Sequence, residues 1–162
     1  MNVADANANT TLRVYVSRFI AAPRERLFEA WLDPEIRRRW WLTARGDGPT
    51  ACDIDARVGG RYCIKQIGSG AESADEDDDY EWIMEGEFVE IVEPEKIAFT
   101  WKVNHPNEPP SDELVTVEFR AVKGGTEVTL THTGILSSRL RDGTEEGWTK
   151  LLETLAGVMQ GQ

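Results

Sequence analysis

The chain has 162 residues, 40% of them apolar, which indicates one globular domain that we place at residues 11–162, after a disordered tail at residues 1–10. The formal net charge of −11 argues against a nucleic-acid surface, and no stretch approaches the ~20 consecutive apolar residues that cross a bilayer. We therefore expect a cytoplasmic protein that binds no nucleic acid and does not insert into membranes.

The first predicted elements are a strand and two short helices. Residues 11–20 are rich in β-branched and aromatic side chains, as strands are. Pro23 suits the first turn of a helix, and Asp33 before Pro34 repeats a helix start. Two short helices are therefore expected directly after the strand.

The second of these helices ends in basic and aromatic residues. We expect Arg37, Arg38 and Arg39 on a solvated face, with a salt-screened contact to the acidic loop or to an acidic partner as the alternative. Of Trp40 and Trp41, we expect one in the core and the other at its rim, where the two short helices close one mouth of the interior.

Apolar and polar residues then alternate, which predicts six antiparallel strands. Keeping the apolar residues of the first strand pair on one face requires a three-residue turn at Val58–Gly60 that pairs Ala56 with Tyr62. The strands are expected within residues 52–57, 61–67, 80–88, 95–103, 114–121 and 126–133.

A long helix with one apolar stripe ends the chain. Gly147 near its start costs roughly 0.5–1 kcal/mol relative to alanine. We expect this glycine to let the helix backbone approach the sheet, with Trp148 aimed into the space between them. The apolar stripe of this helix consists of Trp148, Leu151, Leu152, Leu155, Val158 and Met159.

The whole layout is an α+β fold in which helices cover one face of an antiparallel sheet.

Two further features concern redox and metal chemistry. Cys52 and Cys63 show no metal-ligand spacing, and their offset on the two arms of a hairpin predicts free thiols. The acidic loop at about residues 69–80, with Glu81 after it, carries a run of carboxylates without Lys or Arg. We expect a hydrated, mobile loop, with calcium binding or docking of a basic partner as alternatives. We expect no cofactor and no metal.

Six segments of the chain carry a family resemblance: RFIAAPRERLFEAWLDPEIRRRWW, DIDARVGGRY, GEFVEIVEPEKIAFTW, LVTVEF, GGTEVTLTHTG and EEGWTKLLETLAG. In this order, from about Leu12 to Met159, they resemble the family called activator of heat-shock protein 90 ATPase homologues, of the START and Bet v 1-like (SRPBCC) superfamily. The resemblance implies a helix-grip fold, with about six to seven strands wrapped around the C-terminal helix and often an apolar cavity between them. It also implies a chaperone ATPase as a possible partner and a role in the stress response.

Aromatic residues are concentrated on the inward-facing positions. This favours an apolar, aromatic-lined cavity for a small hydrophobic molecule or lipid, and the alternative is that the same side chains simply fill a core. The candidate cavity residues are Trp40, Trp41, Tyr62, Trp82, Met84, Phe88, Phe99, Trp101, Phe119, His132, Trp148, Leu151 and Leu152.

His132 shares the inward parity of Val128 and Leu130. We expect a buried histidine hydrogen-bonded to a neighbour, with a ligand anchor or a general acid or base as alternatives. The leading function is non-enzymatic binding of a small hydrophobic molecule, with no catalytic residue assigned. The alternatives are a co-chaperone-like activator of a heat-shock protein 90 type ATPase acting through its surface, and a cyclase- or hydrolase-type enzyme using His132.

Overall fold

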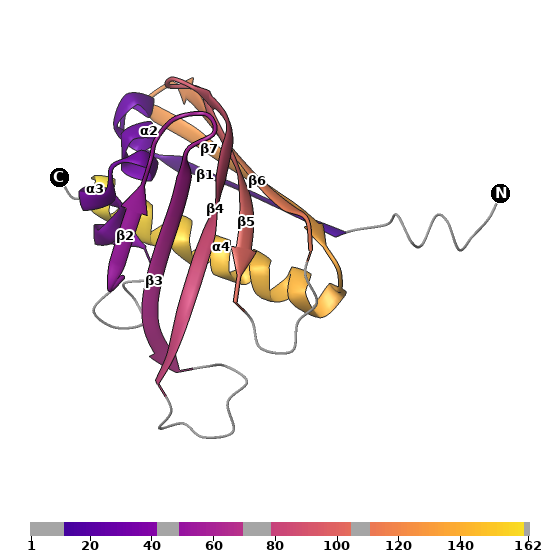
Figure 1. Cartoon of the computed structure of the whole chain (residues 1–162). Coiled ribbons are helices and arrows are strands. Elements are labelled where there is room, and N and C mark those ends of the chain that lie inside the picture. Colours follow the sequence, from indigo (N-terminus) through magenta and orange to yellow (C-terminus); the bar gives the residue numbers. More distant parts are fainter. Residues whose placement is uncertain (1–11, 42–48, 70–78, 105–110, 161–162) are drawn as a thin grey trace.

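A computed structural model describes residues 12–41, 49–69, 79–104 and 111–160 (Figure 1). The predicted tail at residues 1–10 and residues 70–78 of the acidic loop lie outside the described residues. The elements are β1 (Leu12–Ile20), α2 (Arg24–Leu32), α3 (Pro34–Trp40), β2 (Ala51–Ile54), β3 (Arg61–Ser69), β4 (Asp79–Val92), β5 (Lys96–Val103), β6 (Glu113–Val122), β7 (Gly125–Ile135) and α4 (Ser138–Gln160).

The strands form one antiparallel, seven-stranded sheet in the order β1-β7-β6-β5-β4-β3-β2. Helix α4 lies along one face of this curved sheet, and α2 and α3 lie at the end where α4 finishes (Figure 1). The predicted α+β layout is confirmed, because two short helices follow β1 and a long helix follows the last strand. None of the helices within the described ranges is long and apolar enough to span a membrane.

Asp33 joins the two short helices and fixes where α2 ends and where α3 begins. Its backbone N–H donates to the carbonyl of Glu29, which closes α2. Its side-chain Oδ1 accepts from the backbone N–H groups of Glu35 (2.8 Å) and Ile36 (3.4 Å), which caps α3. A cap of this kind stabilises a helix by about 1 kcal/mol. The predicted second helix start at Asp33 and Pro34 is confirmed.

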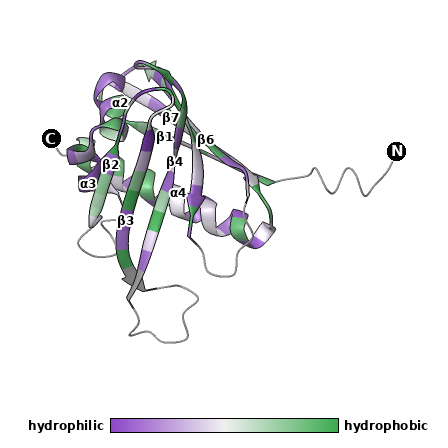
Figure 2. Ribbon diagram, viewed as in Figure 1, coloured by the Kyte–Doolittle hydropathy of each residue, from purple (hydrophilic) through white to green (hydrophobic). Residues whose placement is uncertain are grey.

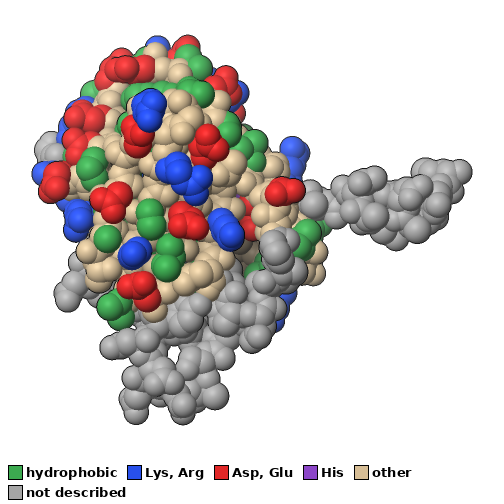
Figure 3. Space-filling view, viewed as in Figure 1, with side chains coloured by type: hydrophobic (Ala, Val, Ile, Leu, Met, Phe, Trp, Pro, Cys, Tyr) green, Lys and Arg blue, Asp and Glu red, His purple; other side chains and the backbone are tan. Residues whose placement is uncertain are grey.

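The inward face of the sheet packs against the apolar stripe of α4. Hydrophobic and hydrophilic residues alternate along the strands (Figure 2), as the two-residue period of a strand requires. Val117 and Leu130 pair directly across β6 and β7 and are fully buried, as is Leu152 of α4. Burial of one such side chain contributes roughly 1.5–3 kcal/mol. The face of the molecule shown in Figure 3 instead carries acidic and basic side chains interspersed with single apolar ones.

The β2–β3 hairpin keeps the predicted faces but not the predicted pairing. β2 ends at Ile54, which pairs with Tyr62, so the three-residue turn that would pair Ala56 with Tyr62 is wrong. The backbone N–H of Gly59, whose φ is +86°, donates to the carbonyl of Phe88 at 2.8 Å. This bond ties the turn to β4, and the connection between β2 and β3 is correspondingly longer.

Cys52 and Cys63 are both free, as predicted. The physical reason differs from the expected one. Cys52 pairs with Ile64 and Cys63 pairs with Asp53. Each cysteine therefore lies one residue away from the position directly opposite the other across the hairpin. Because successive side chains of a strand point to opposite faces, the two thiols lie on opposite sides of the sheet.

Gly147 lies in the middle of α4, and the close approach predicted there is wrong. A Cβ added at Gly147 would have no neighbouring atom within 4 Å. Trp148 does lie between helix and sheet, as predicted, with only 3% of its surface exposed. Because this indole occupies the space between α4 and the sheet, the two backbones do not come close at this point.

Candidate functional site

Five tryptophans meet in the interior, and we call Trp31, Trp40, Trp41, Trp101 and Trp148 the tryptophan cluster. They come from α2, from the end of α3, from β5 and from α4. Ring centroids of contacting members lie between 4.8 Å (Trp31 and Trp40) and 6.5 Å (Trp31 and Trp41) apart. The rings meet edge-to-face or tilted, an arrangement that contributes about 0.5–1.5 kcal/mol per pair beyond the burial of area.

Trp40 and Trp41 are both fully buried, so the expectation that one of them lies at the rim is wrong. The indole Nε1 of Trp40 donates to the carbonyl of Ala30 at 3.1 Å, which fixes this ring against α2. The chain leaves the helix at Trp41 in an extended conformation. That change of direction brings the second indole into the interior as well.

Arg37 lies among three members of the cluster. Its Cζ is 4.1 Å from the ring centroid of Trp41, 5.0 Å from that of Trp31 and 5.4 Å from that of Trp40. Its Nη1 donates to the carbonyl of Trp31 at 2.7 Å. Only 2% of Arg37 is exposed, and burial lowers the pKa of its guanidinium to about 10. The prediction that Arg37 lies on a solvated face is therefore wrong.

Arg38 and Arg39 are exposed, as predicted. Arg37 differs from them because Trp40 and Trp41 follow it at positions i+3 and i+4, which share its side of a helix. This spacing is the signal in the sequence that distinguishes Arg37 from its neighbours.

Several buried hydrogen-bond donors of Arg37 and of the cluster have no partner within the described ranges. They are Nε and Nη2 of Arg37 and the indole Nε1 atoms of Trp31 and Trp41, which have no hydrogen-bond acceptor in the part of the chain that the structure describes. Each of these atoms can only donate. An unpaired buried donor costs about 1–3 kcal/mol, so a group of them within one cluster requires a physical explanation.

His132 is the centre of a series of hydrogen bonds that runs from the first residue of β6, Glu113, to Trp148 on α4. Trp148 Nε1 lies 2.9 Å from His132 Nδ1, and His132 Nε2 lies 2.8 Å from Glu113 Oε1. Because an indole nitrogen only donates, Nδ1 must accept and the ring proton must lie on Nε2, which donates to Glu113. Ser111 Oγ donates to the other oxygen of the same carboxylate. His132 is fully buried, and both of its ring nitrogens have a partner.

Glu113 was not among the predicted site residues, although the sequence contains a signal for it. It has the inward parity of Val115 and Val117 on the same strand. Val115 pairs with His132 across β6 and β7, so Glu113 is the diagonal neighbour of His132 on the inner face. Its side chain is 21% exposed, which places the carboxylate between solvent and interior.

A second aromatic group lies beside the tryptophan cluster and consists of Tyr62, Phe88 and Phe99. Their ring centroids are 5.3–6.1 Å apart. The Tyr62 hydroxyl donates to the carbonyl of Thr100 at 2.6 Å, and burial raises the pKa of Tyr62. Tyr62 pairs with Gly86, where an added Cβ would lie 2.0 Å from that same carbonyl, so only glycine fits this strand position.

The other candidate cavity residues line the same interior from β4, β6 and α4. Trp82 is half-buried, Met84, Leu151 and Leu152 are buried, and Phe119 packs edge-to-face on Phe28 with centroids 5.9 Å apart. The rings of the tryptophan cluster contact one another directly. That these residues line a ligand cavity stays a prediction.

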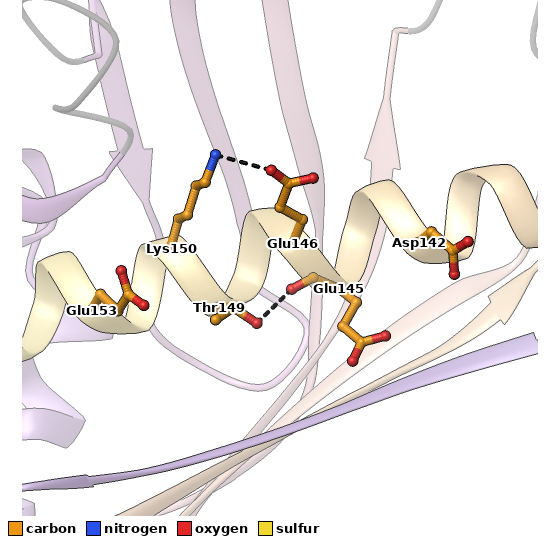
Figure 4. A pocket seen from close by; sticks show the side chains of 6 residues that line it. All are labelled: Asp142, Glu145, Glu146, Thr149, Lys150 and Glu153. Carbon is orange, nitrogen blue, oxygen red and sulfur yellow. Dashed lines mark hydrogen bonds and ion pairs between the residues drawn. The ribbon is translucent and has the colours of Figure 1, made fainter.

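The surface formed by the described residues includes two hollows. One follows the exposed side of α4 and is lined by Asp142, Glu145, Glu146, Thr149, Lys150 and Glu153 (Figure 4). In it Lys150 forms an ion pair with Glu146 at 3.0 Å. The other is a groove between β4, β5 and the start of β6, and its lining includes Trp101 and Glu113. This groove therefore reaches Trp101 of the tryptophan cluster and Glu113, the carboxylate that is hydrogen-bonded to His132. Within the described ranges, no three His, Cys, Asp or Glu residues are placed to hold a metal ion together.

Several solved structures are similar to the chain over most of its length. Protein CV1439 from Chromobacterium violaceum is 23% identical, with a TM-score of 0.73, over 91% of this chain and 96% of that one. A protein from Rhizobium leguminosarum is 22% identical, with a TM-score of 0.77, over 94% and 97%. The Mll3558 protein from Rhizobium loti is 27% identical, with a TM-score of 0.72, over 91% and 96%. These likenesses show the helix-grip-like fold. No curated protein matches the sequence.

The family model described as activator of Hsp90 ATPase homolog 1-like protein matches residues 21–160. The matched range begins directly after β1 and runs through α4. It contains the tryptophan cluster, Arg37 and the hydrogen-bonded residues Glu113, His132 and Trp148. The resemblance that the sequence segments indicate is confirmed. The chain therefore belongs to the family of activator of Hsp90 ATPase homolog 1-like proteins.

Proposed function

We propose that this chain is a cytoplasmic binding domain that holds a small apolar or aromatic molecule between the sheet and α4 and catalyses no reaction on it. The observation that carries the proposal is the set of buried donors in Arg37 and the tryptophan cluster that find no partner among the described residues. A core selected for stability alone would use phenylalanine at such positions, because an unpaired buried N–H costs about 1–3 kcal/mol. A bound molecule with acceptor atoms offsets that cost.

The arrangement of His132 favours binding over catalysis. A general acid or base must exchange a proton with the substrate through a ring nitrogen that is within hydrogen-bond reach of it. In His132, Trp148 occupies Nδ1 and Glu113 occupies Nε2. The histidine thus orients the Trp148 indole, and a cyclase or hydrolase mechanism has no free nitrogen to use.

Access to the interior requires movement of aromatic side chains. The rings of the tryptophan cluster are in contact, so a ligand must displace at least one of them. Trp101 is the member best placed to move, because it is half-buried and lines the groove between β4, β5 and β6. Binding by this route changes the surroundings of several indoles and is therefore visible in tryptophan fluorescence.

Native mass spectrometry of the protein purified from its own host tests the proposal. The expected result is a discrete mass increment that disappears on denaturation, since only a buried and fairly tight ligand survives purification. Trp101→Leu should reduce the fraction of protein that carries the increment. Phe28→Leu removes a buried ring from the Phe28–Phe119 pair instead and serves as the matched control. A bare chain mass in the wild type, together with unchanged fluorescence on addition of host metabolite extract, would refute the proposal.

Family membership favours a second candidate, in which the chain activates a heat-shock protein 90 type ATPase through its surface. This candidate predicts faster ATP turnover by the chaperone as the chain is added. The measurement is the steady-state ATPase rate against concentration of the chain, with heat-denatured chain as the control. A rate that does not change at saturating concentration excludes this role.

A further inference from the structure

Arg37 is a buried positive charge without a counter-ion among the described residues. Its guanidinium is held by the carbonyl of Trp31 and by the faces of three indoles. None of the carboxylates in the described ranges lies within 4.0 Å of it. Indole faces attract a cation but do not neutralise its charge, and an unpaired charge in an apolar interior is costly.

The titratable neighbours of Arg37 do not supply the missing negative charge. Cys52 on β2 and Tyr62 on β3 are the groups whose charges interact with it. Burial raises the pKa of the Cys52 thiol and the pKa of the Tyr62 phenol, so both side chains are neutral at physiological pH. Arg38 and Arg39, the adjacent residues on α3, are positive as well and add to the imbalance.

The free hydrogen-bonding edge of Arg37 has a defined geometry. Nη1 is used by the Trp31 carbonyl, whereas Nε and Nη2 have no acceptor in the described ranges. Nε and Nη2 form one edge of the planar guanidinium, and two parallel bonds from such an edge match the two oxygens of a carboxylate. The indole N–H groups of Trp31 and Trp41, which have no acceptor among the described residues either, belong to rings whose centroids lie 5.0 and 4.1 Å from Arg37 Cζ.

We propose that the molecule held in the interior is an organic acid, with its carboxylate on the Nε–Nη2 edge of Arg37 and its apolar body against the tryptophan cluster. This inference rests on the proposed binding function and specifies its ligand class. A single negative charge is the match for a single buried guanidinium. A dianion such as a phosphate monoester would leave one negative charge uncompensated in the apolar interior.

The test compares acids with their neutral amides of the same shape. The probes are benzoate and benzamide, 2-naphthylacetate and 2-naphthylacetamide, and decanoate and decanamide. Affinities are measured at pH 7.5 by isothermal titration calorimetry on the full chain as wild type, Arg37→Met and Arg38→Met. Arg38→Met is the matched control, because Arg38 is the exposed neighbour on the same helix.

For at least one pair, the wild type is expected to bind the acid roughly tenfold or more tighter than the amide, the ratio that one charge-assisted hydrogen bond supplies. Arg38→Met should keep this ratio. Arg37→Met should reduce it to about one while leaving the amide affinity unchanged. If Arg37→Met fails to fold, as judged by circular dichroism, Arg37→Gln takes its place with the same expectation, because it too is neutral.

The outcomes separate this inference from the proposed function. Equal binding of acid and amide by the wild type overturns the acid inference and leaves the binding function standing. An acid preference that survives Arg37→Met also overturns it, because the charge that selects the acid must then lie elsewhere. Failure of every probe to bind overturns the acid inference, whereas the binding function is decided separately by the mass increment in native mass spectrometry.

Discussion

The bond between Glu113 and His132 leads to a prediction of energetic coupling. In Glu113→Ala the Nε2–H of His132 loses its acceptor while the ring stays fully buried. A hydrogen bond to a charged group contributes about 1.5–3 kcal/mol, and the partial exposure of Glu113 admits water that lowers the loss, so we expect a cost of about 2 kcal/mol. His132→Leu removes the imidazole and leaves the Trp148 N–H unpaired, which costs about 1–3 kcal/mol.

The double variant distinguishes coupling from simple addition. With His132 replaced, the further loss of Glu113 leaves no additional buried N–H unpaired, so Glu113→Ala/His132→Leu should be about as stable as His132→Leu alone. The expected coupling free energy is about 1.5–2 kcal/mol. Urea unfolding followed by far-ultraviolet circular dichroism measures all four proteins. Glu118→Ala is the control, because Glu118 is an exposed carboxylate on the same strand and should change stability by less than about 0.5 kcal/mol. If the cost of the double variant equals the sum of the two single costs within about 0.5 kcal/mol, the predicted energetic coupling between Glu113 and His132 is refuted.

Three further predictions concern the framework around the site. Gly86→Ala should lower the free energy of unfolding in urea by roughly 3 kcal/mol or more, because its Cβ would lie 2.0 Å from the Thr100 carbonyl oxygen. Gly124→Ala is the control: the added Cβ would meet no atom closer than 3.9 Å, so the positive φ alone should cost about 1 kcal/mol. Equal costs for the two variants would contradict the steric argument. Above about pH 10 the unfolded chain releases the Tyr62 proton while the folded protein keeps it, so stability falls with rising pH, and Tyr62→Phe should lose less stability between pH 9 and 11 than the wild type. Asp33→Ala should lower the free energy of unfolding by about 1 kcal/mol and Asp33→Asn by less, since the amide oxygen still accepts from the α3 backbone; an equal loss in both would mean that the charge, not the cap, matters.

The sequence predicted the framework well because period and parity are local properties. Val117 and Leu130 are buried where alternation places them, and Asp33 starts α3 where its side chain can cap the helix. The same parity placed His132 on the inner face. Its partner Glu113 was missed because strand register, which makes the two residues diagonal neighbours, depends on the turn geometry and not on either strand alone.

The wrong predictions concern residues whose surroundings are unusual for their residue type. The sequence predicts a solvated Arg37, because arginine is almost never fully buried without a paired charge, yet three indoles enclose it. Gly147 was expected to be a close-approach site because helix-interior glycine is costly, yet an added Cβ meets no neighbour. Both errors come from using an average preference where the positions of the surrounding tryptophans decide.

The close spacing of the tryptophan cluster has an optical consequence. Indoles with centroids 4.8–6.5 Å apart couple their electronic transitions, so the five chromophores absorb as one asymmetric array. The near-ultraviolet circular dichroism of the folded protein should therefore be intense and built of paired bands of opposite sign. Any state that keeps its helices and strands but loses fixed side-chain packing would lose these bands first, which makes the array a built-in reporter of interior order.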